Sequence, residues 1–264
     1  MHITRTSKLV PALASAISIL AVGPAAADGA PRIAPIFSKP GGQTYGRWAV
    51  EWWQWALGVP AAANPLIDTT GEHCAERQVD GTWFLAGSAG TEPIVRACDI
   101  PEGKALFFPL INNFYGAFLN DAPETRTEAY VRDQASCKSP IELSAEIDGR
   151  EIRGLQRFFT GESGSQSPVF NLQLPPGNIV GDEATVPELV LSPSAEQGYY
   201  LFVKPLSPGE HIVHWHAEGC QTADFVQDIA YNLTIVPAED EAAHEPDDAK
   251  EPVGGMTPAD LRGH

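Results

Sequence analysis

The sequence lacks the short motifs by which common enzyme classes are recognised. It contains no HExxH zinc motif, no phosphate-binding loop, no EF-hand loop, no CxxC pair and no dinucleotide fingerprint after a predicted strand. The segment 161–165 approaches a nucleophile elbow but has Ser165 where the last glycine is required. These absences do not exclude an enzyme, but they exclude an assignment by motif.

Basic residues are scarce. The chain has 17 Lys and Arg against 34 Asp and Glu. A surface of this sign repels phosphate backbones and anionic lipids, so we expect no nucleic-acid partner. After residue 27 no stretch is long and apolar enough to cross a membrane, so we expect no transmembrane segment in the mature chain.

Residues 1–27 have the composition of a secretory signal peptide. Arg5 and Lys8 precede an apolar run over 9–22, and three alanines over 25–27 provide a small-residue cleavage site. Removal of this segment leaves 15 bases and 34 acids, a formal charge of −19. We therefore expect an exported protein, located in the periplasm or outside the cell.

The opposite end of the chain is acidic and has no aromatic residue. Residues 238–264 hold eight acids and two bases, a composition typical of a disordered tail. Between the two ends no convincing linker interrupts the sequence. The predicted organisation is a signal peptide over 1–27, one domain over 28–237 and an acidic tail over 238–264.

The four cysteines predict two disulfides, because an even count in an exported chain favours cross-links. Three connectivities are possible. We favour Cys74–Cys98, which brackets one short segment, and Cys137–Cys220, which ties the middle of the chain to the penultimate strand. The second would close a long loop, stabilising the fold by roughly 3–5 kcal/mol in the chain-entropy model.

Short apolar segments separated by turn residues dominate the domain, which predicts a mainly β fold. The clearest is a hairpin over 141–159 around a two-residue turn at Asp148 and Gly149. Residues 175–193 hold four prolines and predict an irregular crossover. About nine strands favour an antiparallel β-sandwich of jelly-roll or immunoglobulin-like type. The other predicted strands span 82–87, 94–98, 104–111, 169–174, 199–204, 210–217 and 226–236.

A tryptophan-rich helix is predicted over 44–60. Trp48, Trp52 and Trp55 recur at helical spacing and share one face, which must be covered by a large apolar surface. One interpretation is that this helix closes one side of the β core. The alternative is that part of it, with Glu51 and Trp53, lines a ligand site.

A second, surface helix is predicted over 121–136. Asp121 would serve as its N-cap, and Pro123 would lie in the first turn, where its missing N–H costs nothing.

Glu51, Asp68 and His73 are the candidate catalytic residues. A glutamate buried beside tryptophans would have a raised pKa, and an acid pair could then support glycoside-type hydrolysis. The alternatives are structural: Glu51 would pair with Arg47 one turn earlier, and Asp68 would hold the turn that follows it.

Aromatic stacking on a small ligand is a further possibility. Trp53 would be the central residue of such a platform, and the alternative is an ordinary aromatic core. The predicted ligand contacts are Trp53, Arg96, Lys104 and Asn112, with Phe114, Tyr115, Tyr199 and Tyr200 as further aromatic candidates.

His211, His214 and His216 form the candidate metal site, for Zn or Cu. On a strand, alternate residues share a face, so His214 and His216 would present two imidazoles together. A third ligand would come from His73, Glu218 or Asp224. The alternative is that these are solvent-facing or hydrogen-bonded structural histidines.

Several motifs together resemble an uncharacterised family of exported microbial proteins. They are Trp-x3-Trp-Trp-x-Trp from Trp48, Asn64-Pro65, Trp83 to Gly87, Cys98-x2-Pro-x-Gly-Lys-x2-Phe-Phe-Pro, and Pro205 to His211. The resemblance covers most of the predicted domain. It implies export and one compact domain, and it carries no catalytic residue.

The sequence therefore predicts an exported, disulfide-stabilised β-sandwich that binds a small molecule, a glycan or a protein. A secreted hydrolase or metal-dependent enzyme is the second hypothesis, and a structural envelope protein is the third. An enzyme requires polar groups from distant segments to meet in one pocket.

Overall fold

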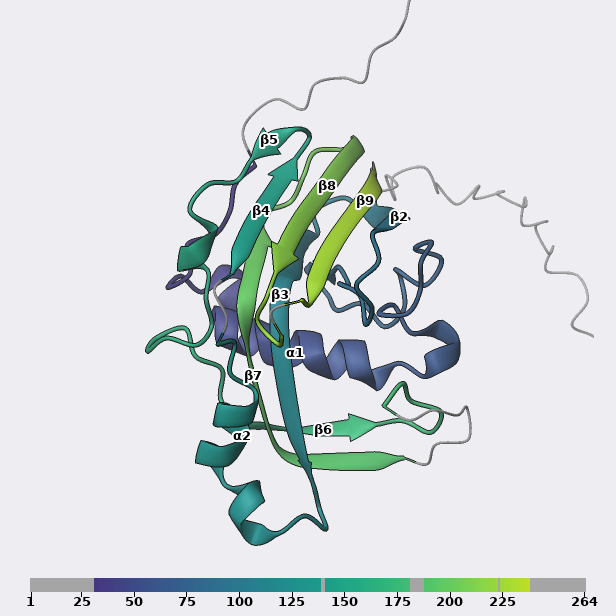
Figure 1. Ribbon diagram of the computed structural model, residues 1–264. Coiled ribbons are helices and arrows are strands. Elements are labelled where there is room, and N and C mark those ends of the chain that lie inside the picture. The colour runs from purple at the N-terminus through teal and green to yellow at the C-terminus, as the bar shows by residue number, and fades with distance from the viewer. Residues whose placement is uncertain (1–30, 139–140, 181–187, 223, 238–264) are drawn as a thin grey trace, which may run out of the picture.

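A computed structural model describes residues 31–138, 141–180, 188–222 and 224–237 (Figure 1). The predicted signal peptide and acidic tail lie outside these residues. The described chain forms two α-helices, α1 (Tyr45–Gly58) and α2 (Glu128–Gln134), and short 3-10 turns. Its nine strands are β1 (Thr82–Phe84), β2 (Ile94–Pro101), β3 (Ala105–Phe118), β4 (Glu142–Ile147), β5 (Arg150–Glu151), β6 (Phe170–Leu174), β7 (Leu189–Val203), β8 (Gly209–Glu218) and β9 (Val226–Val236).

The strands form two sheets that pack together. The first sheet has the order β1-β3-β7-β6, and the second has the order β2-β9-β8-β4-β5. Phe107 and Phe108 are neighbours on β3 and so point to opposite faces. Phe108 stacks on Trp215 of β8 at 4.8 Å between ring centroids, and Phe107 meets Trp48 of α1 at 6.2 Å. The first sheet is therefore covered by the second sheet on one face and by α1 on the other.

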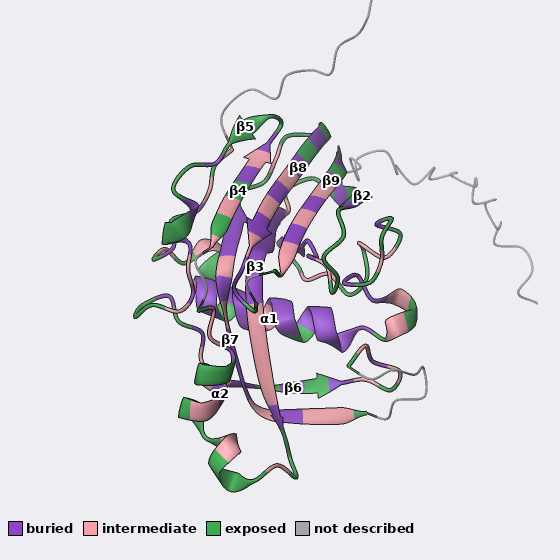
Figure 2. Ribbon diagram, viewed as in Figure 1, coloured by how far each residue is buried: buried purple, intermediate pink, exposed green. Residues whose placement is uncertain are grey.

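The tryptophan helix forms as predicted and closes the core. Thr44 caps it by accepting a hydrogen bond from the Arg47 N–H at 3.3 Å. The four tryptophans of α1 are all buried (Figure 2). Among the described residues, no helix is long and apolar enough to span a membrane.

Two strand pairs run parallel, so both sheets are mixed rather than wholly antiparallel. β1 pairs with β3, and β2 pairs with β9, each in parallel. The chain passes from β1 into the second sheet at β2 before it returns at β3. Because no hairpin joins β1 to β3, the two neighbours are free to run in the same direction. The remaining pairs are antiparallel, as predicted.

The predicted two-residue turn between β4 and β5 is confirmed. Asp148 and Gly149 both have positive φ, 54° and 70°, which the primed turn requires. The return strand is much shorter than predicted, because β5 ends at Glu151 and the chain leaves the sheet for a 3-10 turn over Leu155–Arg157.

Two other boundaries differ from the prediction. β7 begins at Leu189, inside the segment predicted to be irregular, because β3 and β6 pair with it on either side despite Pro193. The predicted helix over 121–136 divides into a 3-10 turn and the shorter α2. Thr127, not Asp121, caps α2, by accepting a hydrogen bond from the Tyr130 N–H.

β3 and β7 extend past the second sheet toward α2 and β6 (Figure 1). In its first half β3 is buried between the second sheet and α1. Residues 113–116 are only half-buried, as Figure 2 shows along the lower part of the strand. This uncovered part of β3 forms one wall of the pocket described below.

Both predicted disulfides are present. Cys74–Cys98 joins the loop after α1 to β2, with 6.0 Å between the Cα atoms. Cys137–Cys220 joins the segment after α2 to the turn between β8 and β9, with 4.2 Å between the Cα atoms. The described cysteines are thus all cross-linked.

Candidate ligand pocket

A pocket of about 400 Å³ lies beside α1, where β3 leaves the cover of the second sheet. Its volume falls in the range of small-molecule sites. Trp53 and Phe114 form an aromatic wall, with 4.9 Å between their ring centroids. Leu57 and Leu66 add aliphatic surface. Together these side chains give the pocket a largely apolar wall.

Four carboxamides line the same pocket: Asn112, Asn113, Gln221 and Gln227. Two of them support the structure around it. Asn113 donates to the carbonyls of residue 134, the last residue of α2, and of residue 136. Gln227 donates to the carbonyls of residues 88 and 90 and accepts from the Ser88 N–H. They fix the segments that form the rim.

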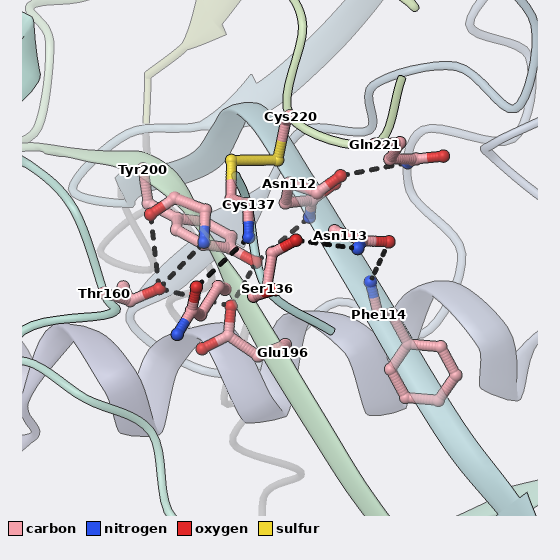
Figure 3. Close-up of a disulfide and its surroundings, with 12 residues drawn as sticks. Asn112, Asn113, Phe114, Ser136, Cys137, Thr160, Glu196, Tyr200, Cys220 and Gln221 are labelled. Atoms are coloured by element: carbon pink, nitrogen blue, oxygen red, sulfur yellow. Dashed lines mark hydrogen bonds between the residues drawn. A yellow bond between two sulfur atoms is a disulfide. The ribbon is translucent and has the colours of Figure 1, made fainter. Parts of the chain in front are cut away.

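The other two carboxamides keep an acceptor for a ligand. Asn112 donates through Nδ2 to the Tyr200 hydroxyl at 3.0 Å. Gln221 donates through Nε2 to the Asn112 carbonyl at 3.0 Å, as Figure 3 shows. No described residue donates to Asn112 Oδ1 or to Gln221 Oε1. Two acceptor oxygens thus belong to residues that line the pocket.

The disulfide between Cys137 and Cys220 holds this end of the pocket in place (Figure 3). Cys220 directly precedes Gln221 in the chain. The Cys137 N–H donates to Gln197 Oε1 on β7 at 3.1 Å. The cross-link therefore anchors the turn that carries Gln221 to the first sheet.

The described pocket lining has almost no ionisable side chain. It includes no Asp, Glu, His, Lys or Arg, and its one ionisable group is the phenol of Tyr115. Partial burial raises the pKa of Tyr115, with the neighbouring Tyr130 and Asp121 adding to the effect. This phenol is therefore neutral at physiological pH.

An acidic group is buried behind the pocket. Glu196 of β7 is fully buried, and its Oε2 accepts from the Tyr200 hydroxyl at 2.8 Å and from the Thr160 hydroxyl at 3.3 Å. Its other oxygen has no partner among the described residues. Burial raises the pKa of Glu196 to about 7, although the hydrogen bonds from the hydroxyls oppose the shift.

Tyr200 connects this carboxyl group to the pocket. Its hydroxyl accepts from Trp53 Nε1 at 3.1 Å and from Asn112 Nδ2 while it donates to Glu196. Trp53 and Asn112 both line the pocket. Only the side chain of Tyr200 thus separates Glu196 from two groups that line the pocket.

The predicted catalytic residues do not meet. Asp68 accepts from the N–H groups of Thr70, Gly71 and His73, so it holds its own loop. Although partial burial opposes the shift, these bonds lower the pKa of Asp68 to about 2. Glu51 accepts from Gln43 at 2.7 Å, not from Arg47. Within the described chain, no hydrogen bond or ion pair joins Glu51 to Asp68 or His73, and none of the three lines the pocket.

The predicted ligand contacts divide into two groups. Trp53 and Asn112 line the pocket, whereas Arg96 and Lys104 do not. Arg96 is 1% exposed and donates to the carbonyls of residues 68, 86 and 87 and to the Tyr231 hydroxyl. Lys104 lies 4.0 Å from Asp80, which is fully exposed. Arg96 therefore anchors loops rather than a ligand.

The three predicted metal-binding histidines do not lie on one face. His211 points into the core, where its Nδ1 lies 2.8 Å from Asp148 Oδ2 and its Nε2 lies 2.9 Å from the Ser207 carbonyl. His214 and His216 point outward from β8, as predicted. In the described residues no three His, Cys, Asp or Glu side chains already converge as a metal site.

Sequence reasoning missed Glu196, Gln221 and Gln227. A signal existed for Glu196, because it alternates with Ser194 and Gly198 on a strand that continues into buried aromatic residues. Gln221 and Gln227 carry no comparable signal, since only the tertiary fold brings them to β3.

No protein-family model matches this chain, and no curated protein is significantly similar to it.

Proposed function

We propose that this protein is an exported binding protein whose pocket takes a small, neutral molecule. The observation that carries the proposal is the pocket lining: an aromatic and aliphatic wall, four carboxamides, and no carboxylate, imidazole or amine among the described residues. Such a lining is typical of a site that recognises a ligand by shape and hydrogen bonding.

The same lining favours binding over hydrolysis. General acid–base catalysis requires a titratable group within hydrogen-bond reach of the reacting atoms. Asp68 and His73 belong to a loop outside the pocket, and Glu51 is engaged by Gln43. Glu196 contacts Tyr200, not the pocket surface.

The free acceptors indicate the chemistry of the ligand. Asn112 Oδ1 and Gln221 Oε1 accept hydrogen bonds, so the ligand would carry an O–H or N–H donor on an aromatic or aliphatic body. A charged ligand would find no counter-ion among the described lining residues and would lose its hydration, which is costly. The proposed class is therefore a neutral aromatic or alicyclic alcohol, phenol or amide.

Export is supported by the N-terminal sequence and by the two disulfides, which form in oxidising compartments. Cell fractionation followed by N-terminal sequencing tests this part of the proposal. We expect the protein in the periplasm or medium, beginning at Asp28. A cytosolic protein with residues 1–27 intact would contradict it.

Binding is tested by ligand-observed NMR with neutral aromatic alcohols and amides and with charged analogues of the same rings. Ala89→Trp places an indole at the exposed edge of the pocket without removing a core side chain. Ala75→Trp is the matched control, because Ala75 is also exposed but does not line the pocket.

We expect neutral compounds to bind the wild type and the Ala75→Trp variant but not Ala89→Trp. Gln221→Met should weaken the binding of compounds that have a hydrogen-bond donor about tenfold, since one hydrogen bond between neutral groups contributes about 0.5–1.5 kcal/mol. The binding of purely apolar rings should not change. Binding that persists in Ala89→Trp, or a preference for charged analogues, would contradict the proposed site.

A further inference from the structure

The hydrogen bonds of the Tyr200 hydroxyl determine which atom of Asn112 faces the pocket. This hydroxyl lies 3.1 Å from Trp53 Nε1, 3.0 Å from Asn112 Nδ2 and 2.8 Å from Glu196 Oε2. Figure 3 shows Asn112, Tyr200 and Glu196 together. A hydroxyl group has one hydrogen and two lone pairs, so it donates once and accepts twice. The three bonds therefore use the whole capacity of the Tyr200 hydroxyl.

Two of the three partners have only one possible role. The indole N–H of Trp53 can only donate, so it occupies one lone pair of the hydroxyl. An ionised carboxylate can only accept, so the single hydrogen of Tyr200 goes to Glu196. The third bond must then come from a donor, which is Asn112 Nδ2. The oxygen of the same carboxamide, Asn112 Oδ1, is left as an acceptor at the pocket.

Burial keeps the hydrogen on Tyr200. Tyr200 and Glu196 are both 0% exposed. Burial raises the pKa of Tyr200 well above its usual value of 10, and the neighbouring Glu196 adds to the shift. Burial also raises the pKa of Glu196 to about 7, although the hydroxyls around it and the positive charge of Arg132 on α2 oppose this shift. At pH 8.5 the pair is therefore a phenol and a carboxylate.

An amide in place of the carboxylate would reverse the order of donors and acceptors. Glu196 Oε2 faces the hydroxyls of Tyr200 and Thr160, whereas Oε1 has no partner among the described residues. A glutamine would turn its NH₂ group toward the two hydroxyls, because at the position of Oε1 that group would leave two donors unpaired. Tyr200 would then accept from the glutamine and donate to Asn112 Oδ1. Asn112 would present Nδ2 to the pocket.

We propose that Glu196 and Tyr200 are positioning residues that make the pocket select ligands with a hydrogen-bond donor. This inference rests on the proposed binding function. The carboxylate orients the Tyr200 hydroxyl, the hydroxyl orients the Asn112 carboxamide, and Asn112 presents an acceptor to the ligand. Neither Glu196 nor Tyr200 is among the described residues that line the pocket, so their effect on selectivity passes through Asn112.

The first test uses no ligand. Hydrogen exchange of the Asn112 side-chain amide is followed by NMR at pH 8.5 in mature protein labelled with ¹⁵N-asparagine, and Asn112→Ala assigns the signal. Glu196→Gln replaces the acceptor by an amide, and Glu196→Met removes it. Glu51→Gln is the matched control, because Glu51 accepts from Gln43 and is not among the described lining residues. Circular dichroism confirms that each variant folds.

We expect slow exchange in the wild type and in Glu51→Gln, because one amide hydrogen of Asn112 is bonded to Tyr200. In Glu196→Gln and Glu196→Met the NH₂ group would face the pocket, and its exchange should be about tenfold faster or more. Unchanged exchange in both Glu196 variants would overturn the proposal, whether or not a ligand binds.

The second test compares 1-phenylethanol, which has an O–H donor, with acetophenone, which has the same carbon skeleton and only accepts. Calorimetric titration at pH 8.5 should show that the wild type and Glu51→Gln prefer the alcohol about tenfold. Glu196→Gln should lower this preference about tenfold, because Asn112 then donates. In a Tyr200→Phe background, Glu196→Gln should not change the preference further, since the connection is missing.

The two tests separate the inference from the function on which it rests. The same preference in the wild type and in Glu196→Gln would overturn the positioning role while the binding function stands. Faster amide exchange in both Glu196 variants, with neither probe bound by any protein, would support the positioning of Asn112 and contradict the binding function.

Discussion

Each sheet buries one ionisable side chain against a tyrosine, and the two pairs are organised differently. In the second sheet, Arg96 of β2 contacts Tyr231 of β9. In the first sheet, Glu196 of β7 contacts Tyr200 of the same strand. Arg96 and Glu196 are 1% and 0% exposed. Burial of a charge is unfavourable unless hydrogen-bond partners replace the lost water. The two side chains avoid this penalty in different ways.

Arg96 keeps its charge and is surrounded by acceptors. Its guanidinium donates to three backbone carbonyls and to the Tyr231 hydroxyl, and it lies 5.4 Å from the centre of the Tyr231 ring. One nitrogen, Nη2, has no hydrogen-bond partner among the described residues. An arginine cannot lose its proton in a protein, so the fold must supply acceptors. Arg96 thereby ties two loops to the sheet.

Glu196 has fewer partners because it can take up a proton instead. Within the described chain only one of its oxygens is hydrogen-bonded, and burial raises its pKa to about 7. Its tyrosine partner also contacts Trp53 and Asn112 at the pocket. The comparison indicates that the arginine network is structural, whereas the glutamate network can change its protonation state beside the candidate pocket.

Replacing Arg96 should have the largest effect. Arg96→Met would remove the donor of four hydrogen bonds, although the Ala86 carbonyl and the Tyr231 hydroxyl would still be bonded to each other. We expect the free energy of unfolding to fall by about 3–5 kcal/mol. Urea denaturation measures it. Lys104→Met is the control, because its 4.0 Å contact with fully exposed Asp80 is a surface ion pair that contributes little to stability. Equal losses in both variants would contradict the anchoring role of Arg96.

Glu196→Gln should change the pH dependence of stability. The unfolded carboxyl loses its proton near pH 4.5 and the folded one near pH 7, so between these values the folded state binds more protons. The wild type should therefore lose roughly 3 kcal/mol of stability as pH rises from 4.5 through 7. Urea denaturation from pH 4 to 8 should show this slope reduced in Glu196→Gln but retained in Glu51→Gln. An unchanged slope would contradict a buried, protonated Glu196.

Removing the two tyrosine hydroxyls should separate structure from binding. Tyr200→Phe and Tyr231→Phe should each lower the free energy of unfolding by about 1–3 kcal/mol, because each leaves buried partners unpaired. Tyr200→Phe should also weaken neutral ligands, since Trp53 and Asn112 lose their common acceptor. Tyr231→Phe should leave ligand affinity unchanged. Thermal unfolding and ligand titration of both variants measure the two effects. Equal ligand affinities in the two variants would contradict the proposed difference between the two sheets.

Asp68→Asn should have the smallest effect on stability, and only at acidic pH. The carboxylate contributes stability above its unfolded pKa of 3.8, and that contribution is lost as pH falls through the folded value of about 2. Because the side chain is partly exposed, we expect only about 1 kcal/mol after allowance for solvent screening. Acid unfolding between pH 2 and 5 tests it, with Asp80→Asn as an exposed control.

Local signals predicted much of the fold. The Asp148–Gly149 turn, β9 over 226–236, the tryptophan helix and both disulfides follow from turn chemistry, periodicity and cysteine count. The parallel pairs, in contrast, depend on which sheet the chain enters after β1. The extension of β7 through Pro193 likewise depends on β3 and β6, which pair with it on either side. The periodicity of the sequence does not reveal these partners.

The candidate site was less accessible to sequence reasoning. Trp53 was predicted because it belongs to an aromatic-rich helix, and Asn112 because it lies in the same N-terminal half of the sequence. Gln221 reaches the pocket from the turn between β8 and β9, beside the cross-linked Cys220, and Glu196 is connected to α1 through Tyr200. Such roles arise from contacts between residues distant in sequence.

The most direct test of the pocket follows the indole signals of ¹⁵N-tryptophan-labelled protein while indole, a neutral probe with one N–H donor, is added. We predict a saturable shift of the Trp53 signal, because Trp53 forms the pocket wall, and no shift of Trp215, which is buried between the sheets. Ala89→Trp should abolish the Trp53 shift. No movement of Trp53, or the same movement in Ala89→Trp, would contradict a ligand pocket at this position.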